Sequence, residues 1–301
     1  MQIENQETQG ELFVLGEAIL YGFFPLVVNH AVKFVSPLLF AGLSSLVAAV
    51  ALFIYLFSTK TFHHLFNKKA LIYILGVTLF IIVLPSIFIF IGTSFTSGVN
   101  TTILLQAEVF FTFLFCGLFF GEKITSKKLI GALAIVIGTT IVIFNGSLVI
   151  NWGDILILSG VAFYPFGNMC AKKALSMVPS TAILFIRSFL GGLILILLSF
   201  IFESSFSVLG STIFNFYLFI LINGLAVMFL SKIFWYEGLK RIDISKAITI
   251  GMSYPAFSLI FLFLFVQEIP NLYQLIGLFV TMAGVVFITY KKKKNIPVPQ
   301  P

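Results

Sequence analysis

The chain has 301 residues, of which 59% are hydrophobic and only 10% are charged, and its mean hydropathy is +1.11. This composition is that of an integral membrane protein and excludes a water-soluble domain. At about 20 apolar residues per crossing, the chain accommodates roughly ten membrane-spanning helices and has no room for a soluble catalytic domain. The net charge of +7 comes from loops that flank apolar runs, so we expect a lipid bilayer and no nucleic acid as its partner.

The hydrophobic runs between charged or turn-rich breaks predict ten helical spans. In chain order they lie near residues 12–32, 36–57, 70–92, 96–120, 128–145, 154–175, 180–202, 213–237, 245–266 and 272–290. We expect 1–11 to be a cytoplasmic tail, 12–145 a first repeat of five helices, 146–153 an outer loop, 154–290 a second repeat of five helices, and 291–301 a basic cytoplasmic tail. The fold class predicted is an all-α polytopic membrane protein with ten transmembrane helices.

The basic residues indicate how the spans are oriented. If the N-terminus is cytoplasmic, the cytoplasmic loops hold fifteen of the 18 Lys and Arg residues, the opposite loops hold Lys33 alone, and Arg187 and Lys232 lie inside spans. The fifteen are Lys60, Lys68, Lys69, Lys123, Lys127, Lys128, Lys172, Lys173, Lys240, Arg241, Lys246, Lys291, Lys292, Lys293 and Lys294. This asymmetry predicts that both termini are cytoplasmic, in a multi-pass protein of the cell inner membrane.

The chain contains an internal repeat. At an offset of 146 residues, FFGEKITSKKLIGALAIVIG (119–138) aligns with FVQEIPNLYQLIGLFVTMAG (265–284) without a gap. The informative matches are Glu122 with Glu268, Gly131 with Gly277, and Gly138 with Gly284. Because each half holds five spans, the second half enters the membrane from the opposite side. The halves are therefore expected to be inverted-topology repeats, an arrangement typical of alternating-access carriers.

These features resemble the drug/metabolite transporter superfamily, and specifically its EamA-type members. The most specific segment, YPAFSLIFLFLFVQEIPNLYQLIGLFVTMAG (254–284), is similar to the family's pattern of a proline in the ninth span, a glutamate thirteen residues later and two glycines in the tenth. The first half departs from the pattern, because Val109 takes the place of Pro255 and Glu108 that of Tyr254. The resemblance covers about residues 12–290. It implies secondary transport of a small metabolite or drug-like molecule, but it leaves the substrate open.

Glu108 is the strongest candidate for a functional residue. It lies twelve residues into the fourth span, near the membrane midplane, where an ionisable group costs on the order of 2.5–3.5 kcal/mol. Polar residues on the same span, Asn100, Gln106 and neighbouring threonines, indicate a polar cavity. We expect Glu108 to take up and release a proton near neutral pH. The alternative is a neutral carboxyl group that is hydrogen-bonded to a neighbouring helix.

Glu17 and Tyr21 lie one turn apart on one face of the first span. A glutamate in this position resembles the small multidrug resistance members of the superfamily, in which it binds cations and protons in turn. The rest of that motif is not evident here, and an interfacial carboxylate is the alternative interpretation.

Further candidates lie in the second half. Lys232 and Trp235 are on the eighth span, and Arg187 is about two turns into the seventh. Either basic residue could instead be a snorkelling anchor, and this is the interpretation favoured for Arg187. Trp235 could instead be an aromatic residue at the membrane interface. Tyr164 and Tyr254 each precede a mid-span proline, which frees a backbone carbonyl or forms a hinge.

Other recurring residues are predicted to be structural. Glu122 and Glu268 stand where a span ends, and each is expected to cap the helix that follows. Glycines recur every seventh residue on those following helices and are expected to form a seam of close helix contact, within or between protomers. They are Gly131, Gly138, Gly277 and Gly284.

The sequence as a whole predicts a secondary active transporter of a small organic metabolite. Opposite charges at membrane depth in the two halves favour an amino acid or amino-acid-like solute, moved by proton-coupled alternating access. The alternative is an exporter of organic cations or drugs that uses Glu17 and Glu108. No enzymatic activity, metal or cofactor is implied, because the spans carry no catalytic or nucleotide-binding motif. The direction of transport and the oligomeric state stay open.

Overall fold

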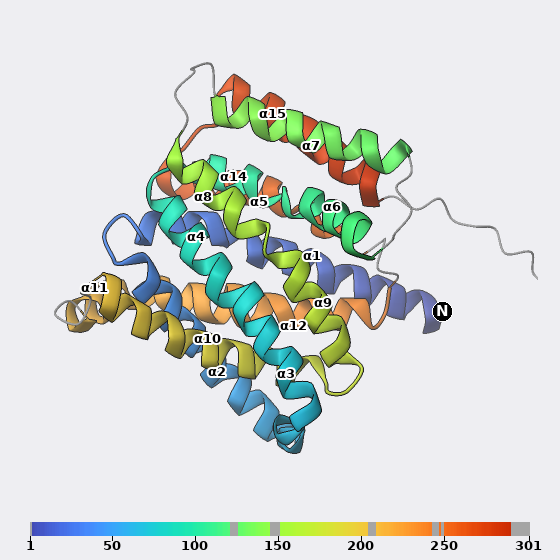
Figure 1. The fold of residues 1–301 in the computed structure, drawn as a ribbon, viewed down its shortest axis with the longest axis vertical. Coiled ribbons are helices and arrows are strands. Elements are labelled where there is room, and N and C mark those ends of the chain that lie inside the picture. The colour runs from blue at the N-terminus through green and yellow to red at the C-terminus, as the bar shows by residue number, and fades with distance from the viewer. Residues whose placement is uncertain are drawn as a thin grey trace, which may run out of the picture.

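The computed structural model describes residues 2–120, 126–144, 151–203, 209–242, 247 and 250–289, and within these ranges every regular element is a helix. The helices run roughly alongside one another in a single bundle (Figure 1). Glu122, Asn145 and the basic tail after residue 289 lie outside the described residues.

The first half runs from α1 to α7. Its elements are α1 (Gln2–Ala31), α2 (Pro37–Ser58), the short η1 (Phe62–Phe66), α3 (Lys68–Val77), the π-helical η2 (Thr78–Val83), α4 (Leu84–Ser94), α5 (Gly98–Leu105), α6 (Glu108–Phe120) and α7 (Ser126–Phe144). The second half contains α8 (Trp152–Val161), α9 (Tyr164–Leu175), α10 (Ser180–Phe202), α11 (Leu209–Leu221), the π-helical η4 (Ile222–Leu230), α12 (Ser231–Leu239), α14 (Tyr254–Val266) and α15 (Leu272–Thr289).

Ten apolar helical segments match the ten expected spans. Eight of them are long and apolar enough to cross a membrane, and the shorter apolar helices α14 and α15 complete the set. Most boundaries agree with the expected ones to within a few residues. The largest difference is at the start, where α1 begins at Gln2 rather than near residue 12, because a helix can continue through polar residues beyond its apolar run.

The packing of the two halves is symmetric. The fifth span, α7, packs along the tenth, α15 (Figure 1), and the second span, α2, packs along the seventh, α10. The third span packs on the sixth, through α4 on α8 and α3 on α9. In the same way, the eighth span packs on the first, through α12 and η4 on α1. If each span is replaced by the corresponding span of the other half, the first two contacts are unchanged and the last two exchange. Both the third and the eighth span also contain a π-helical segment. This is the packing that two repeats of five spans require.

Pairs of glycines mark the closest helix crossings. At each of them a Cβ atom on one glycine would lie 3.2 Å or less from the backbone oxygen of the other, so neither position accepts a side chain without movement of the helices. The pairs are Gly131 with Gly284, Gly138 with Gly277, Gly42 with Gly192, Gly92 with Gly153, and Gly10 with Gly238. The predicted seam on α7 and α15 therefore lies within one chain.

Three spans are broken near their middle. Turns at residues 106–107, 162–163 and 252–253 separate two helical segments of the fourth, sixth and ninth spans. The segments after these turns begin at Glu108, Tyr164 and Tyr254. Pro165 and Pro255 lie in the first turn of α9 and α14, where the missing backbone N–H has no helical partner to lose. The break at 106–107 has no proline, yet it falls at the repeat offset of 146 residues from the break at 252–253.

Candidate functional site

The three breaks bring the first residues of α6, α9 and α14 into one polar cluster. Tyr164 and Tyr254 both lie close enough to Glu108 to interact with its charge. Tyr21, from α1, meets Tyr254 edge to face, with 5.1 Å between the ring centroids. The hydroxyl group of Tyr254 donates to the carbonyl oxygen of Thr102 at 3.3 Å. Four of the residues that the sequence singled out thus come together from four spans.

Glu108 has a hydrogen-bond partner that the sequence did not suggest. The side-chain amide of Asn168, on α9, donates to the Glu108 carboxylate at 3.1 Å, and Asn168 is exposed. Asn168 lies one helical turn after Tyr164, so both side chains lie on one face of α9. That spacing is the signal from which Asn168 could have been found.

Gln106 is the polar residue of the adjacent break. Its side chain is buried, and its Nε2 atom has no hydrogen-bond partner among the described residues. Such buried donors are rare because each costs about 1–3 kcal/mol. An unpaired donor therefore lies two residues from Glu108.

Lys232 and Glu17 form an ion pair between the first and eighth spans. The ammonium nitrogen lies 3.2 Å from the carboxylate and 4.2 Å from the centroid of the Tyr21 ring. The two side chains are 26% and 9% exposed, respectively. Lys232 thus pairs with a residue of the adjacent helix, and the pair joins the two halves beside the cluster.

Trp235 and Arg187 lie at the margins of this cluster. Trp235 packs against Gly251 within a small apolar group that includes Val14 and Ile242. Arg187, on α10, lies within electrostatic reach of Tyr164 and Tyr236. Its Nε atom is buried without a hydrogen-bond partner in the described part of the chain.

The bundle has two ends, and we call the one whose loops carry the basic residues the basic end. We call the opposite end the clamped end, because a set of side chains there holds residues 95–100. These residues are the turn after α4 and the first turn of α5, and we call them the 95–100 loop. Asp154, fully buried in the first turn of α8, accepts hydrogen bonds from Thr96 Oγ1 at 2.5 Å and from Asn100 Nδ2 at 3.1 and 3.3 Å. Gln274, on α15, donates to Asn100 Oδ1 at 2.7 Å. Asn100, which the sequence counted among the polar residues of a cavity around Glu108, therefore belongs to this clamp.

Two more side chains complete the clamp. Glu268 accepts hydrogen bonds from the backbone amides of Gly98 and Val99 at 3.2 and 2.9 Å, so it caps α5 in the other half. The expectation that Glu268 caps the following helix is wrong, because Asn271 caps α15. Asn29, on α1, donates to the backbone oxygens of Thr93, at the end of α4, and of Thr96, in the 95–100 loop.

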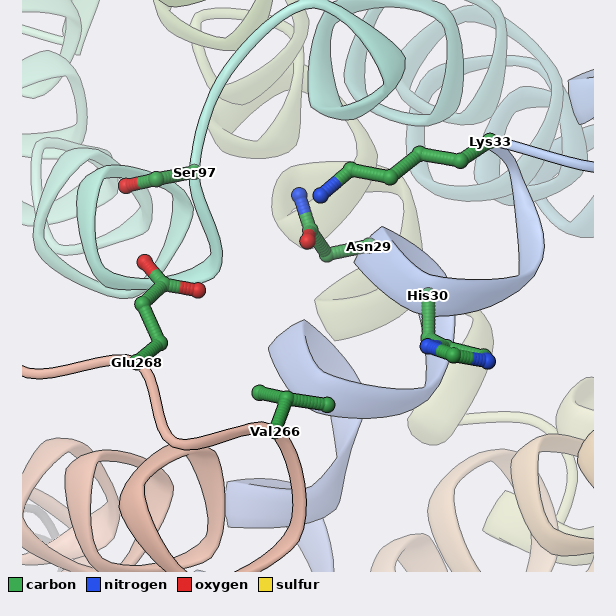
Figure 2. A pocket seen from close by; sticks show the side chains of 6 residues that line it. All are labelled: Asn29, His30, Lys33, Ser97, Val266 and Glu268. Atoms are coloured by element: carbon green, nitrogen blue, oxygen red, sulfur yellow. The ribbon is translucent and has the colours of Figure 1, made fainter.

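The clamp lies over an apolar core. The members of that core include Phe24, Val28, Phe90, Leu104 and Ile157, all at most 6% exposed. Above the clamp a cavity of about 370 Å³ opens at the clamped end; Figure 2 shows Lys33 beside Asn29 in it, with the Glu268 carboxylate turned toward the chain at Ser97. The clamp and this core thus close the clamped end, whereas Asn168, the partner of Glu108, is exposed.

Ten apolar spans in two inverted halves, with a polar cluster where three spans break near their middle, define the architecture of a membrane carrier. A family model described as the EamA-like transporter family matches residues 8–144 and 151–290, one copy in each half, and the chain belongs to this family. It is therefore a transporter and an integral, multi-pass membrane protein that handles a small-molecule substrate.

Curated relatives agree with this assignment. The chain is 24% identical over 288 residues to the uncharacterized transporter YetK of Bacillus subtilis (strain 168), which covers 94% of this chain and 85% of that protein. It is 22% identical over 289 residues to the uncharacterized transporter YoaV of the same organism, covering 93% and 96%. A crystal structure with 16% sequence identity superimposes with a TM-score of 0.67 over 93% of this chain and 96% of the other, which supports the fold.

Proposed function

We propose that the protein is a proton-coupled secondary transporter that moves an amino acid or amino-acid-like solute across the cell inner membrane by alternating access. The basic end is cytoplasmic in this proposal, as the distribution of Lys and Arg residues favours. Both termini then face the cytoplasm.

The observation that carries the proposal is the meeting of three broken spans at Glu108, Tyr164 and Tyr254. The start of a helix carries partial positive charge and free amide groups, and discontinuous helices at the midplane are a recurrent way to build a carrier's substrate site. The unpaired Gln106 donor beside this point supports a role in ligand binding, because a polar substrate can satisfy it.

Alternating access is supported by the difference between the two ends. At the clamped end, Asp154, Gln274 and Glu268 of the second half hold the 95–100 loop of the first half above an apolar core. Toward the basic end, Asn168, the partner of Glu108, is exposed, whereas Glu108 itself is half-buried. We interpret the structure as the state that is closed to the outside, with the transport cycle requiring the clamp to open.

Glu108 is the proton-coupling residue in this proposal. It lies where the substrate path must cross, and an intramembrane carboxylate beside a bound solute can exchange a proton as access changes sides. The rings of Tyr21, Tyr164 and Tyr254 around it can also hold an ammonium group by cation–π attraction. The same rings favour the alternative function, export of organic cations.

The test is uptake of labelled amino acids into proteoliposomes under an imposed pH gradient. Glu108→Gln keeps the size and hydrogen bonding of the side chain but fixes its charge at zero, so we expect it to abolish the response to the gradient. Glu237→Gln is the matched control, because Glu237 pairs with Lys240 and Arg241 outside the cluster. Gradient-driven uptake that is unchanged in Glu108→Gln contradicts proton coupling through this residue. Competition by quaternary ammonium compounds, with none by amino acids, would establish the cation exporter instead.

A further inference from the structure

We infer that Arg187 is the residue that binds the carboxylate group of the substrate. The inference rests on the proposed transport of an amino-acid-like solute and names the chemistry that its binding site selects. The sequence alone favoured a membrane anchor for Arg187 and chose Lys232 as the binding residue, although it counted both among the basic groups of the second half.

The first step is that Lys232 is already neutralised. It forms an ion pair with Glu17 at 3.2 Å and lies over the ring of Tyr21. A substrate carboxylate that bound Lys232 would have to displace Glu17 and leave that nearly buried carboxylate without a counter-charge. Lys232 is therefore a poor receptor for a second anion.

The second step is that Arg187 has no such partner. Among the described residues, no carboxylate lies within ion-pair distance of it, and its buried Nε atom donates no hydrogen bond. A guanidinium group presents five donors in a planar fork that matches a carboxylate, and a charge held inside a membrane protein is normally paired. A ligand carboxylate would supply both the missing charge and the missing acceptor.

The third step is the position of Arg187 relative to Glu108. Tyr164 lies within electrostatic reach of both residues, so the acidic and the basic group both approach the start of α9. Tyr236, from α12, also lies within electrostatic reach of Arg187. A solute whose ammonium group faces Glu108 and the tyrosine rings can therefore direct its carboxylate to Arg187.

This arrangement balances charge without rearranging the bundle. Within the described spans, the Glu17–Lys232 pair is neutral as a unit, although the charge of Lys232 also acts on Glu108, and Glu108 and Arg187 are the remaining opposite charges around Tyr164. A zwitterion compensates both at once. A cation would leave Arg187 uncompensated, and an anion would leave Glu108 uncompensated whenever that residue is ionised.

The experiment measures ligand binding by the purified full-length protein in lipid nanodiscs. The probes are leucine, leucinamide and isocaproate, together with the corresponding three forms of phenylalanine. For each side chain, the amino acid carries both charged groups, the amide lacks the carboxylate, and the deaminated acid lacks the amine. The readouts are isothermal titration and ligand-dependent thermal stability. The variants are Arg187→Met, Arg187→Lys and, as the matched control, Arg241→Met, because Arg241 contacts Glu237 and the ring of Phe13 outside the cluster.

We expect the wild-type protein to bind the amino acid about 10- to 100-fold more tightly than its amide, the range for a charge-assisted hydrogen-bonded pair. Arg187→Met should remove this difference and leave amide binding unchanged, which also shows that the variant is folded. Arg187→Lys should restore part of the difference, since it keeps the charge but not the fork. Arg241→Met should keep all of it.

Two outcomes overturn the inference. The first is an amino-acid-to-amide ratio that is the same in Arg187→Met as in the wild type, which would leave the proposed transport of amino acids intact. The second is that no carboxylate in the panel binds the wild type. In a different outcome, the wild type binds isocaproate but not leucine, and Arg187→Met does not bind isocaproate. That result would support the Arg187 site and contradict an amino acid as the substrate.

Discussion

Removal of the Asp154 side chain should open the clamped end. Asp154 is fully buried and accepts hydrogen bonds from the Thr96 hydroxyl group and the Asn100 amide, each on the 95–100 loop of the other half. Asp154→Ala leaves both donors buried without an acceptor. At about 1–3 kcal/mol for each donor, the state in which the clamp is closed loses about 2–6 kcal/mol.

This loss shifts the conformational equilibrium only if the clamp opens during transport. In an outward-open state Thr96 and Asn100 would face water, so the substitution would cost that state little. The lower limit of 2 kcal/mol then corresponds to a shift of about 30-fold toward the open state. Asp154→Asn keeps one acceptor oxygen and should have a smaller effect.

A cysteine in the apolar core measures the shift. Val28 is fully buried beneath the clamp, so Val28→Cys, in a background without Cys116 and Cys170, should react slowly with a membrane-impermeant maleimide added from outside. Adding Asp154→Ala should accelerate labelling by about 30-fold or more. Ser94→Ala is the control, because the Ser94 hydroxyl bonds only within its own helix, to Ile91. A folded Asp154→Ala variant with unchanged labelling would refute the reasoning and leave Asp154 a purely structural residue.

Three further predictions follow from the topology, the helix seam and the ion pair. Reporter fusions after Asn145 should report the outer face and fusions after Lys69 and Lys292 the cytoplasmic face; a reversed result at Lys292 would contradict the assigned orientation. Gly131→Ala places a Cβ atom 2.6 Å from the Gly284 carbonyl oxygen, so the melting temperature in detergent should fall by the equivalent of about 1–3 kcal/mol. Gly210→Ala is the control: a Cβ atom there meets no atom within 4 Å, so the melting temperature should not change. Lys232→Met should destabilise the protein by about 1–3 kcal/mol, because it leaves Glu17 unpaired. Adding Glu17→Gln should restore most of this stability. Equal melting temperatures for Lys232→Met and the wild type would show that the pair contributes nothing.

The sequence was a good guide to the spans and to the repeat. A span is set by the local sum of side-chain hydrophobicity over about 20 residues, which requires no knowledge of neighbours. The glycines of α7 and α15 recurred at equal spacing in both halves, and the structure pairs them within one chain because only a missing side chain allows such close backbone contact. The mid-span prolines at 165 and 255 likewise pointed to two of the three helix breaks.

The partners of the polar residues were decided by the tertiary structure alone. Nothing local at Glu268 indicates that it caps a helix of the other half, and Asp154 gave no signal at the edge of its apolar run. The break before Glu108 contains no proline, so nothing in the sequence indicated that Asn100, on the same span, would bond to the clamp instead of lining a cavity with Glu108. Above all, the sequence favoured Lys232 over Arg187 as a site residue, since Arg187, about two turns inside its span, was better explained as a snorkelling anchor. In the described part of the chain, the packing of α1 against α12 pairs Lys232 with Glu17, and Arg187 has no ion-pair partner, because a charge in the membrane takes its role from whatever the neighbouring helices place within reach.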